Sequence, residues 1–359
     1  MSHMLLYADV PAFYAEVERA ANPGLRERPV IVGGDPRKRG LVQAATPDAV
    51  AAGVAPGMTV LDALARCPRA RALRTDMPRY REMDKRLRAS LARSVERLEP
   101  AGLGAAYLDP GEWLGPPGRS DSLEALAEAL RDAIAHELQL PLRVGAGPVK
   151  FIARLAAEEA RALQFLAVPA SRVAAFLAPL PVSRLPGVGP NTAARLAELG
   201  AASVEQLVAL GRGPIERALG NHGLAILASA LGRGDERVRA ASHPQTLSQE
   251  VTLRGDELDR AALGERLHAL AERLERALAL EGLVARRLAL KVRYADGERI
   301  TRTQSLERGV ATADALLERA LDLLGRTQAG TRPLRLLGLA ASGLARPARD
   351  ERQLPLFEA

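Results

Sequence analysis

The sequence has few of the residues that build disulfides, zinc centres or membrane spans. A single cysteine, Cys67, excludes an internal disulfide and a cysteine-based zinc site, and we expect it to pack in a core. No run of about 18 apolar residues occurs, so no helix is expected to cross a membrane. No secretory signal pattern opens the chain, and this favours a cytoplasmic protein.

The chain does have enough apolar residues for sizeable cores, and it has an excess of positive charge. Its 359 residues are 47% hydrophobic, and this length predicts two to four domains. Residues 1–3 are typical of a cloning remnant ahead of a native start at Met4. The net charge of +7 favours an anionic partner, nucleic acid first. All but four of the 50 basic residues are arginine, which also fits a GC-rich coding bias, so the positions of the charges must decide.

The order of the expected elements divides the chain. Short strands and helices alternate up to Phe165, with a long amphipathic helix over residues 78–98, and this predicts an α/β or α+β layer. Residues 170–235 predict short helices separated by glycine-rich turns, and residues 239–245 have the composition of a linker. From residue 246 the expected order is strand, helix, strand, strand, helix, strand, which describes a small split βαβ module.

The first candidate site is Asp9, which follows the expected apolar strand over residues 5–8. A carboxylate at the end of a strand can hold a metal ion, and the helix that follows can offer backbone N–H groups to phosphate. Taken alone, an aspartate in this place is more often a cap or turn residue. Both roles stay open.

The segment SRLPGVGPNTAARLAELG, residues 183–200, is the second candidate. Gly187, Val188 and Gly189 lie between two short expected helices, where a DNA phosphate could approach bare backbone amides. The segment is similar to a helix-hairpin-helix, which grips the DNA backbone without selecting bases. A tight turn between helices is the alternative, and the pattern favours DNA binding.

Positive charge gathers on one face of an expected strand in the last module. Alternation in RRLALKVRY places the residues on two faces: Leu288, Leu290, Val292 and Tyr294 on one, and Arg287, Lys291 and Arg293 on the other. A cationic face suits a phosphate backbone, and Arg254 and Arg302 are further candidates for such contacts. A solvated edge strand would show the same pattern.

The motif QLPLF lies near the end of a polar tail and consists of Gln353, Leu354, Pro355, Leu356 and Phe357. Apolar anchors outside any core suggest a pocket on a partner. The motif is similar to the pentapeptide that docks proteins on the bacterial sliding clamp.

Together these segments resemble the Y-family DNA polymerases from Leu5 to about Leu344. The matching segments, in the family's order, are ADVPAFYAEVE, NPGLRERPVIVGG, AAGVAPGM, AAYLD, VGAGPVKFIARLAAE, LPGVGPNTAARLAELG, SQEVTL, LALKVRYADG and LLGLAASGL. The resemblance implies an α+β fold with a right-hand architecture. Its parts would be a palm (4–20 and 76–165), small fingers (21–75), a helical thumb with the helix-hairpin-helix (166–238), a linker (239–245), a split βαβ little finger (246–345) and a flexible tail (346–359).

The resemblance also implies where catalysis would lie. The family holds two Mg²⁺ ions with three carboxylates, of which one matches Asp9. The neighbouring Asp-Glu pair falls on Gly104 and Ala105, and a further family aspartate falls on Pro11. Hard divalent ions need several charged oxygens, so we expect no cofactor, or Mg²⁺ or Mn²⁺ bound at most weakly at Asp9.

The nucleotide pocket of the family is also only partly kept. Tyr14 matches the ring that excludes a 2′-hydroxyl, and Arg161 can stand for a phosphate-binding lysine. The tyrosine and arginine that contact the triphosphate fall on Pro47 and Val50, neither of which has a side-chain donor.

These departures predict a pseudo-polymerase, similar to the inert ImuB type of bacterial mutagenesis cassettes. It would bind primer–template, damaged or single-stranded DNA and the sliding clamp at the nucleoid, as an accessory scaffold in damage tolerance. A separate replicative or lesion-bypass polymerase is a further expected partner, and no membrane is. Two alternatives stay open: a slow or Mn²⁺-dependent translesion polymerase with substitute metal ligands, and a protein-interaction adapter without DNA affinity.

Overall fold

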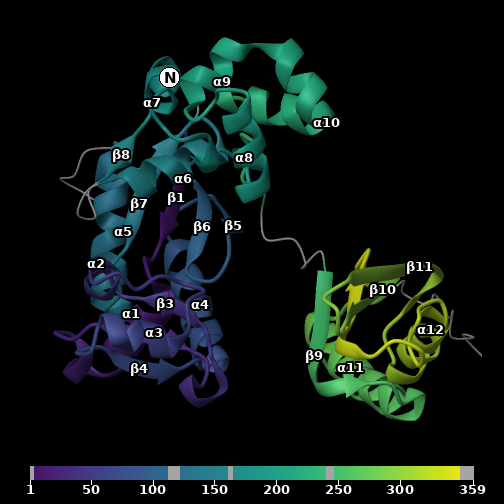
Figure 1. Cartoon of the computed structure of the whole chain (residues 1–359). Coiled ribbons are helices and arrows are strands. Elements are labelled where there is room, and N and C mark those ends of the chain that lie inside the picture. The colour runs from purple at the N-terminus through teal and green to yellow at the C-terminus, as the bar shows by residue number, and fades with distance from the viewer. Residues whose placement is uncertain (1–3, 112–121, 161–164, 240–245, 348–359) are drawn as a thin grey trace, which may run out of the picture. The chain divides into compact units, whose positions relative to one another are not determined.

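The computed structural model describes residues 4–111, 122–160, 165–239 and 246–347. The chain divides into two compact units, Met1–Ala241 and Ser242–Ala359 (Figure 1). Their boundary falls inside the segment 239–245, whereas the finer bounds of palm, fingers and thumb stay a prediction. Within the described residues, no helix is both long and apolar enough to cross a bilayer.

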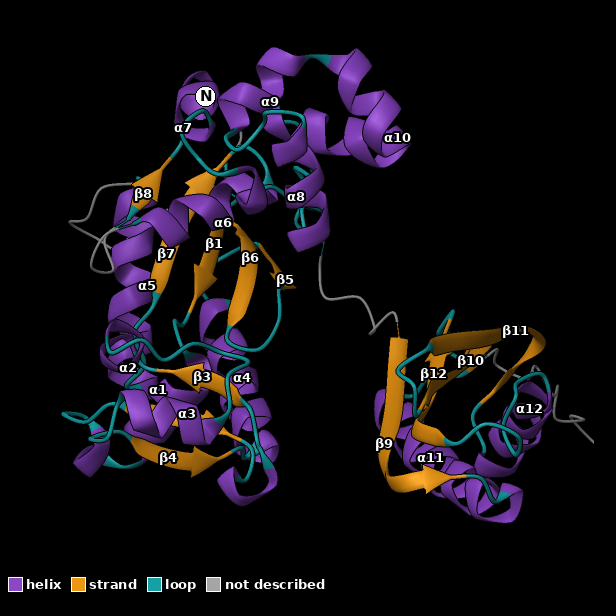
Figure 2. Ribbon diagram, in the orientation of Figure 1, coloured by secondary structure: helices purple, strands orange, loops and turns teal. Residues whose placement is uncertain are grey.

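A five-stranded sheet forms the centre of the first unit. Its spatial order is β5 (Arg97–Pro100), β6 (Ala105–Asp109), β1 (Leu5–Asp9), β7 (Arg143–Gly147) and β8 (Leu166–Ala167) (Figure 2). Neighbouring strands are antiparallel, except that β7 and β8 are parallel. Because β1 is central, its last residue has a strand on either side.

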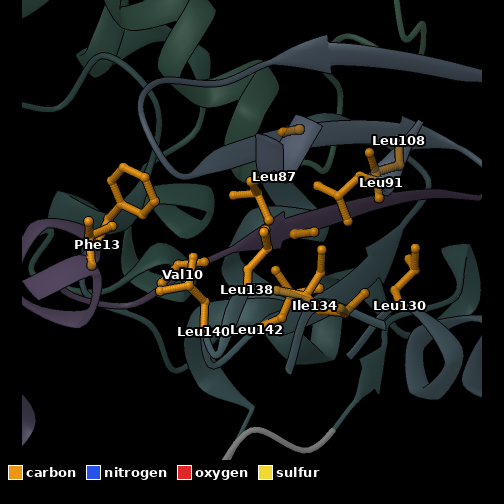
Figure 3. Close-up of a cluster of buried hydrophobic side chains, with 14 of the residues drawn as sticks. Val10, Phe13, Leu87, Leu91, Leu108, Leu130, Ile134, Leu138, Leu140 and Leu142 are labelled. Atoms are coloured by element: carbon orange, nitrogen blue, oxygen red, sulfur yellow. The ribbon is translucent and has the colours of Figure 1, made fainter. Parts of the chain in front are cut away.

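One face of this sheet is covered by α4 (Met77–Leu91) and α5 (Leu123–Leu138). Alternation along β1 points Leu6 and Ala8 into this core. The helices contribute buried side chains at steps of three and four residues, among them Leu87, Leu91, Leu130 and Ile134 (Figure 3). The helix predicted over residues 78–98 ends earlier, at Leu91, because residues 97–100 form β5.

The other face of the sheet carries α6 (Lys150–Glu159), which contacts β1 and β7. The contact is close because β7 has glycines: a Cβ added to Gly145 would lie 2.1 Å from the backbone nitrogen of Ala157. Ala153 and Ala157 pack against Leu5 and Tyr7 of β1. Small residues on both elements therefore set the height of α6 above the strands.

A three-stranded sheet with its own core lies beside α1 (Phe13–Ala21). Its order is β3 (Val42–Ala45), β2 (Val30–Gly33) and β4 (Arg71–Arg74), with two short helices, α2 (Pro47–Ala51) and α3 (Val60–Arg66). Cys67 is buried in this core, as the sequence predicts.

The remainder of the first unit is helical. It consists of α7 (Val173–Leu177), α8 (Pro190–Glu198), α9 (Val204–Leu210) and α10 (Arg212–Ala230), with short 3₁₀ turns at Ala170–Arg172 and Val182–Arg184. Ser203 and Gln206 form a capping box at the start of α9. Leu196, Leu207, Ile215 and Ile226 share one core with Ile152 and Leu155 of α6.

The second unit is a four-stranded antiparallel sheet with two helices on one face. The spatial order is β11 (Arg299–Val310), β10 (Ala285–Tyr294), β12 (Leu334–Ser342) and β9 (Thr246–Glu257), and the helices are α11 (Arg260–Glu281) and α12 (Ala313–Gly325). The chain order β9, α11, β10, β11, α12, β12 confirms the predicted split βαβ arrangement. The predicted α+β fold class is confirmed with it.

Candidate active site and nucleic-acid interface

Asp9 lies at the end of the central strand β1, between two cross-strand neighbours. It is directly opposite Ala105 on β6 and directly opposite Arg143 on β7. Directly opposed residues of antiparallel strands project to the same face. Ala105, Asp9 and Arg143 therefore form one row across the sheet, on the face that also carries α6.

Arg143 binds the carboxylate of Asp9 with two hydrogen bonds. Its Nε donates to Oδ1 at 3.0 Å, and its Nη2 donates to Oδ2 at 2.6 Å. The two side chains are 24% and 14% exposed, so water screens the pair only partly. Burial lowers the pKa of the Arg143 guanidinium, but the hydrogen bonds and charge of Asp9 outweigh it and raise the pKa overall. No sequence motif singles out Arg143.

Gly104 and Ala105 lie beside Asp9, where the resemblance places the family's carboxylate pair. Gly104 has φ +79°, and a Cβ there would be 2.5 Å from Cγ of Phe13. Its N–H donates to Oδ1 of buried Asp84 at 2.8 Å, and its carbonyl accepts from the N–H of Val10. These two hydrogen bonds fix the turn at Gly104 next to β1. Pro11 lies in the turn that follows β1.

The described residues around Asp9 do not fit a site for two divalent cations. Ala105 supplies no oxygen ligand, and both oxygens of Asp9 accept from Arg143. Across the described ranges, no three His, Cys, Asp or Glu side chains come together as a metal cluster would. Asp109, the carboxylate at the end of β6, accepts from the N–H of Gly111.

A cavity of about 620 Å³ opens at the start of α1. Phe13, Tyr14, Gln43, Pro56 and Leu103 are among its lining residues, and no described lining residue carries a charge. A triphosphate would therefore find no cationic partner in that lining. Pro47 and Val50, the predicted replacements of the residues that contact the triphosphate, lie on α2, where Val50 is exposed.

Tyr14 is held in this cavity by a stack. Its ring lies parallel to that of Tyr80, with centroids 4.5 Å apart and planes 10° apart. The Tyr80 hydroxyl donates to Oε1 of Glu18 at 2.9 Å, and Arg79 donates to Oε2 of Glu18 at 2.8 Å. Burial, followed by the Glu18 carboxylate, raises the pKa of Tyr80. Arg161, the other predicted pocket residue, lies outside the described residues.

The predicted helix-hairpin-helix turn is exposed at its tip. Gly187 has φ +80°, which favours glycine, and Gly189 is the N-cap of α8, with open space where a Cβ would lie. Gly187 and Val188 also line a cavity of about 660 Å³ together with Lys150 and Arg154 of α6. Lys150 is not free there, since it binds Glu99 at 2.7 Å and Asp235 at 2.8 Å.

The strand β10 has the predicted alternation, and the basic side chains predicted to bind DNA differ in whether they are exposed or paired. Leu288, Leu290, Val292 and Tyr294 are buried, while Arg287 is exposed. Lys291 is paired with Glu250 at 2.7 Å. Arg302 is directly opposite buried Leu290, so it lies on the other face of the sheet, where it donates to the carbonyl of Arg326. Arg254 lies in β9, and its side chain is outside what the structure describes.

Two arginines on the same face of the sheet as Lys291 oppose each other. Arg293 on β10 is directly opposite Arg299 on β11, and both line a cavity of about 340 Å³. Like charges opposed across a sheet are destabilising. Nε of Arg293 is buried and has no hydrogen-bond partner among the described residues. Glu250 and Lys291 line the same cavity and are paired with each other, so the two arginines leave its lining with a net positive charge that is suited to an anion. The QLPLF residues, 353–357, lie outside the described residues.

Comparison with known proteins identifies relatives over nearly the whole chain. The impB/mucB/samB family matches residues 8–158, its C-terminal domain matches 244–356, and the family's HHH motif matches 170–201. A protein named DNA polymerase IV from Alkalilimnicola ehrlichii is 35% identical over 98% of this chain and 99% of its own length. Another of that name, from Halorhodospira halophila, is 36% identical over 97% of each chain.

Solved structures support the same fold. A chimeric Y-family DNA polymerase built from Dbh and Dpo4 superposes with a TM-score of 0.81, at 22% identity over 96% of this chain and 99% of its own. DinB from Sulfolobus solfataricus gives a TM-score of 0.66, at 22% identity over 94% and 98% of the two chains. At such identities the likeness concerns the fold.

The names of the relatives contradict one prediction from the sequence. The chain was expected to be a pseudo-polymerase, and that prediction is wrong by this comparison, because relatives 30–36% identical are named for an enzyme, DNA polymerase IV. The prediction takes the replaced side chains as a sign that the reaction itself is lost. Removing one group that stabilises a transition state typically lowers a rate by a factor of about 10² to 10³, which does not by itself change the reaction class.

Proposed function

The chain belongs to the impB/mucB/samB family of Y-family DNA polymerases, and from this membership we propose that it is a slow translesion DNA polymerase that binds primer–template DNA during damage tolerance. One observation carries the proposal: the likeness to the Alkalilimnicola ehrlichii protein named DNA polymerase IV extends over 98% of the chain. A role in binding DNA also supports the expected location of the protein at the nucleoid.

The grip on DNA would come from both units. In the second unit, an anionic phosphate between Arg293 and Arg299 would relieve the repulsion of two opposed guanidinium groups. In the first unit, the exposed turn at Gly187 and Gly189 would let a phosphate approach the start of α8. Neither contact selects a base, which suits a protein that must accept damaged templates.

This chain would differ from its relatives in the rate of nucleotide incorporation. Asp9 is paired with Arg143, Ala105 stands opposite it, and the cavity beside Tyr14 has no described cationic lining. Each feature weakens the hold on the charged groups of the reaction. We therefore expect incorporation to be slower than in a typical relative by at least a factor of about 10².

Docking on the sliding clamp through residues 353–357 is the second part of the proposal. The support is the motif itself, with two leucines and a phenylalanine outside the predicted folded modules. A clamp would raise the local concentration of the primer end, which matters most for an enzyme with a low rate. Recruitment of a separate polymerase through the same clamp is compatible with this role.

Primer extension tests the proposal. The full chain is incubated with a labelled primer–template and single dNTPs, in Mg²⁺ and separately in Mn²⁺. We expect slow, template-directed incorporation that Asp9→Ala abolishes and Asp314→Ala, which removes an exposed carboxylate of the second unit, leaves unchanged. Absence of template-directed product in both metals, with an active control polymerase in the same mixture, would overturn the assignment.

A further inference from the structure

The Asp9–Arg143 pair is set by the sheet. Antiparallel pairing of β1 with β7 puts the two residues directly opposite each other, and the planar guanidinium meets the carboxylate edge to edge. Neither residue has a positive φ, and the strand register places the two side chains side by side. The pair is therefore a property of the fold.

Both oxygens of Asp9 are in use in this arrangement. A divalent cation at Asp9 would have to take Oδ1 from Nε of Arg143, Oδ2 from Nη2, or both. The guanidinium already supplies the positive charge that the carboxylate requires in its partly buried place. A cation and Arg143 are consequently alternatives for the same two atoms.

The neighbours of the pair do not relieve this competition. On the far side, Ala105 offers no second oxygen with which a cation could outweigh the guanidinium. Glu158 of α6 acts electrostatically on Arg143, and Tyr7 lies two residues from Asp9 on the same face of β1. Arg154, paired with Glu158, adds further positive charge on that face.

We propose that Arg143 is a built-in competitor for the cation site at Asp9, so that a divalent cation binds at the end of β1 only when the guanidinium leaves the carboxylate. The inference rests on the proposed function for the biological use of the cation. The competition between the Arg143 side chain and a metal ion for Asp9 concerns metal binding alone.

Mn²⁺ binding tests the proposal without DNA or nucleotide. Free Mn²⁺ is followed by electron paramagnetic resonance while it is titrated into the full chain. We expect Arg143→Gln to tighten binding at Asp9 by roughly tenfold, the effect of removing one partner of a partly buried ion pair. Arg143→Lys keeps the charge but loses the two-pronged contact, so a smaller gain of about twofold to threefold is expected. If the glutamine variant does not fold, the lysine variant carries the test.

Two controls fix the site of the effect. Asp9→Asn in the Arg143→Gln background should remove the gained affinity. Arg212→Gln breaks another two-pronged pair, in which Nε of Arg212 binds Glu216 at 3.0 Å, and should leave Mn²⁺ binding within twofold of the unmodified chain.

Three results would each overturn the inference: unchanged Mn²⁺ affinity in the folded Arg143 variants, a gain that survives Asp9→Asn, or an equal gain in Arg212→Gln. Because no primer is present, these outcomes are separate from primer extension. A protein inactive in extension that still gains Mn²⁺ affinity on loss of Arg143 would refute the proposed function and leave this inference standing.

Discussion

Gly104 is a position where a side chain should be poorly tolerated, and Gly104→Asp is the change that examines it. This substitution puts an aspartate where the family resemblance places one, next to Asp9. Two obstacles oppose it. The residue has φ +79°, and a Cβ would lie 2.5, 2.6 and 2.8 Å from Cγ, Cδ2 and Cβ of Phe13. Phe13 is itself buried and cannot swing into solvent without opening a cavity.

The expected cost follows from the two obstacles. A left-handed backbone costs a residue with a side chain about 1–2 kcal/mol. Forcing extra atoms against a buried ring adds about 1–3 kcal/mol. We therefore expect Gly104→Asp to lower the free energy of unfolding of the first unit by roughly 2–5 kcal/mol. Gly57 offers a matched control, because its φ is +89° and nothing lies within 4 Å of its Cβ position.

Urea denaturation followed by circular dichroism measures both variants. Gly57→Asp should show the backbone cost alone, and Gly104→Asp should exceed it by the cost of the clash with Phe13. Truncating the ring, in Phe13→Ala/Gly104→Asp, should recover part of the difference as a favourable coupling energy. Equal losses for Gly57→Asp and Gly104→Asp, with no coupling to Phe13, would refute the packing argument.

Three further predictions concern the DNA contacts, an internal ion pair and the segment 353–357. Arg293→Ala and Arg299→Ala should each weaken DNA binding and reduce the slope of log affinity against log salt by about one, measured by fluorescence anisotropy; an unchanged slope would mean that no phosphate binds between them. Lys150→Met should cost about 2 kcal/mol in urea denaturation, because it removes the cation that the partly buried carboxylates of Glu99 and Asp235 share. The hydrogen bond from Lys150 lowers the pKa of Asp235 below its ordinary 3.8, so the stability it adds is present above that pH and lost as the pH falls below it. That pH dependence should be smaller in Lys150→Met, where Arg239 still binds Asp235 at 2.8 Å, and an unchanged dependence would contradict the assignment. Deletion of residues 353–357 should abolish pull-down by the sliding clamp while leaving DNA binding intact; retained pull-down would place the docking site elsewhere.

Local patterns predicted the elements well. Alternation in RRLALKVRY gave the buried face of β10, and the order of strands and helices after residue 246 gave the split βαβ module. The glycines around Val188 predicted the turn before α8. These features depend on residues close together in sequence, for which periodicity and backbone preference are sufficient.

Pairing between distant segments could not be predicted in the same way. Arg143 is 134 residues from Asp9, and nothing in LRVGAG tells which residue of β1 it will oppose. A shift of one residue in register would turn Arg143 to the other face of the sheet. The conformation of Gly104, set by Phe13 and Asp84, depends on tertiary contacts for the same reason.

This limit bears directly on how positive charge should be interpreted. The net charge of +7 favours a nucleic-acid partner, yet some of the positive charges are neutralised within the chain. Lys291 is paired with Glu250, and Arg143 is paired with Asp9. Arg293 and Arg299 differ from these because each faces another cation across the sheet. A paired cation must give up a partner before it binds phosphate, whereas opposed cations lose repulsion when phosphate arrives. Affinity for DNA should therefore depend more on that opposed pair than on Lys291, although the sequence pattern alone ranks Lys291 and Arg293 alike.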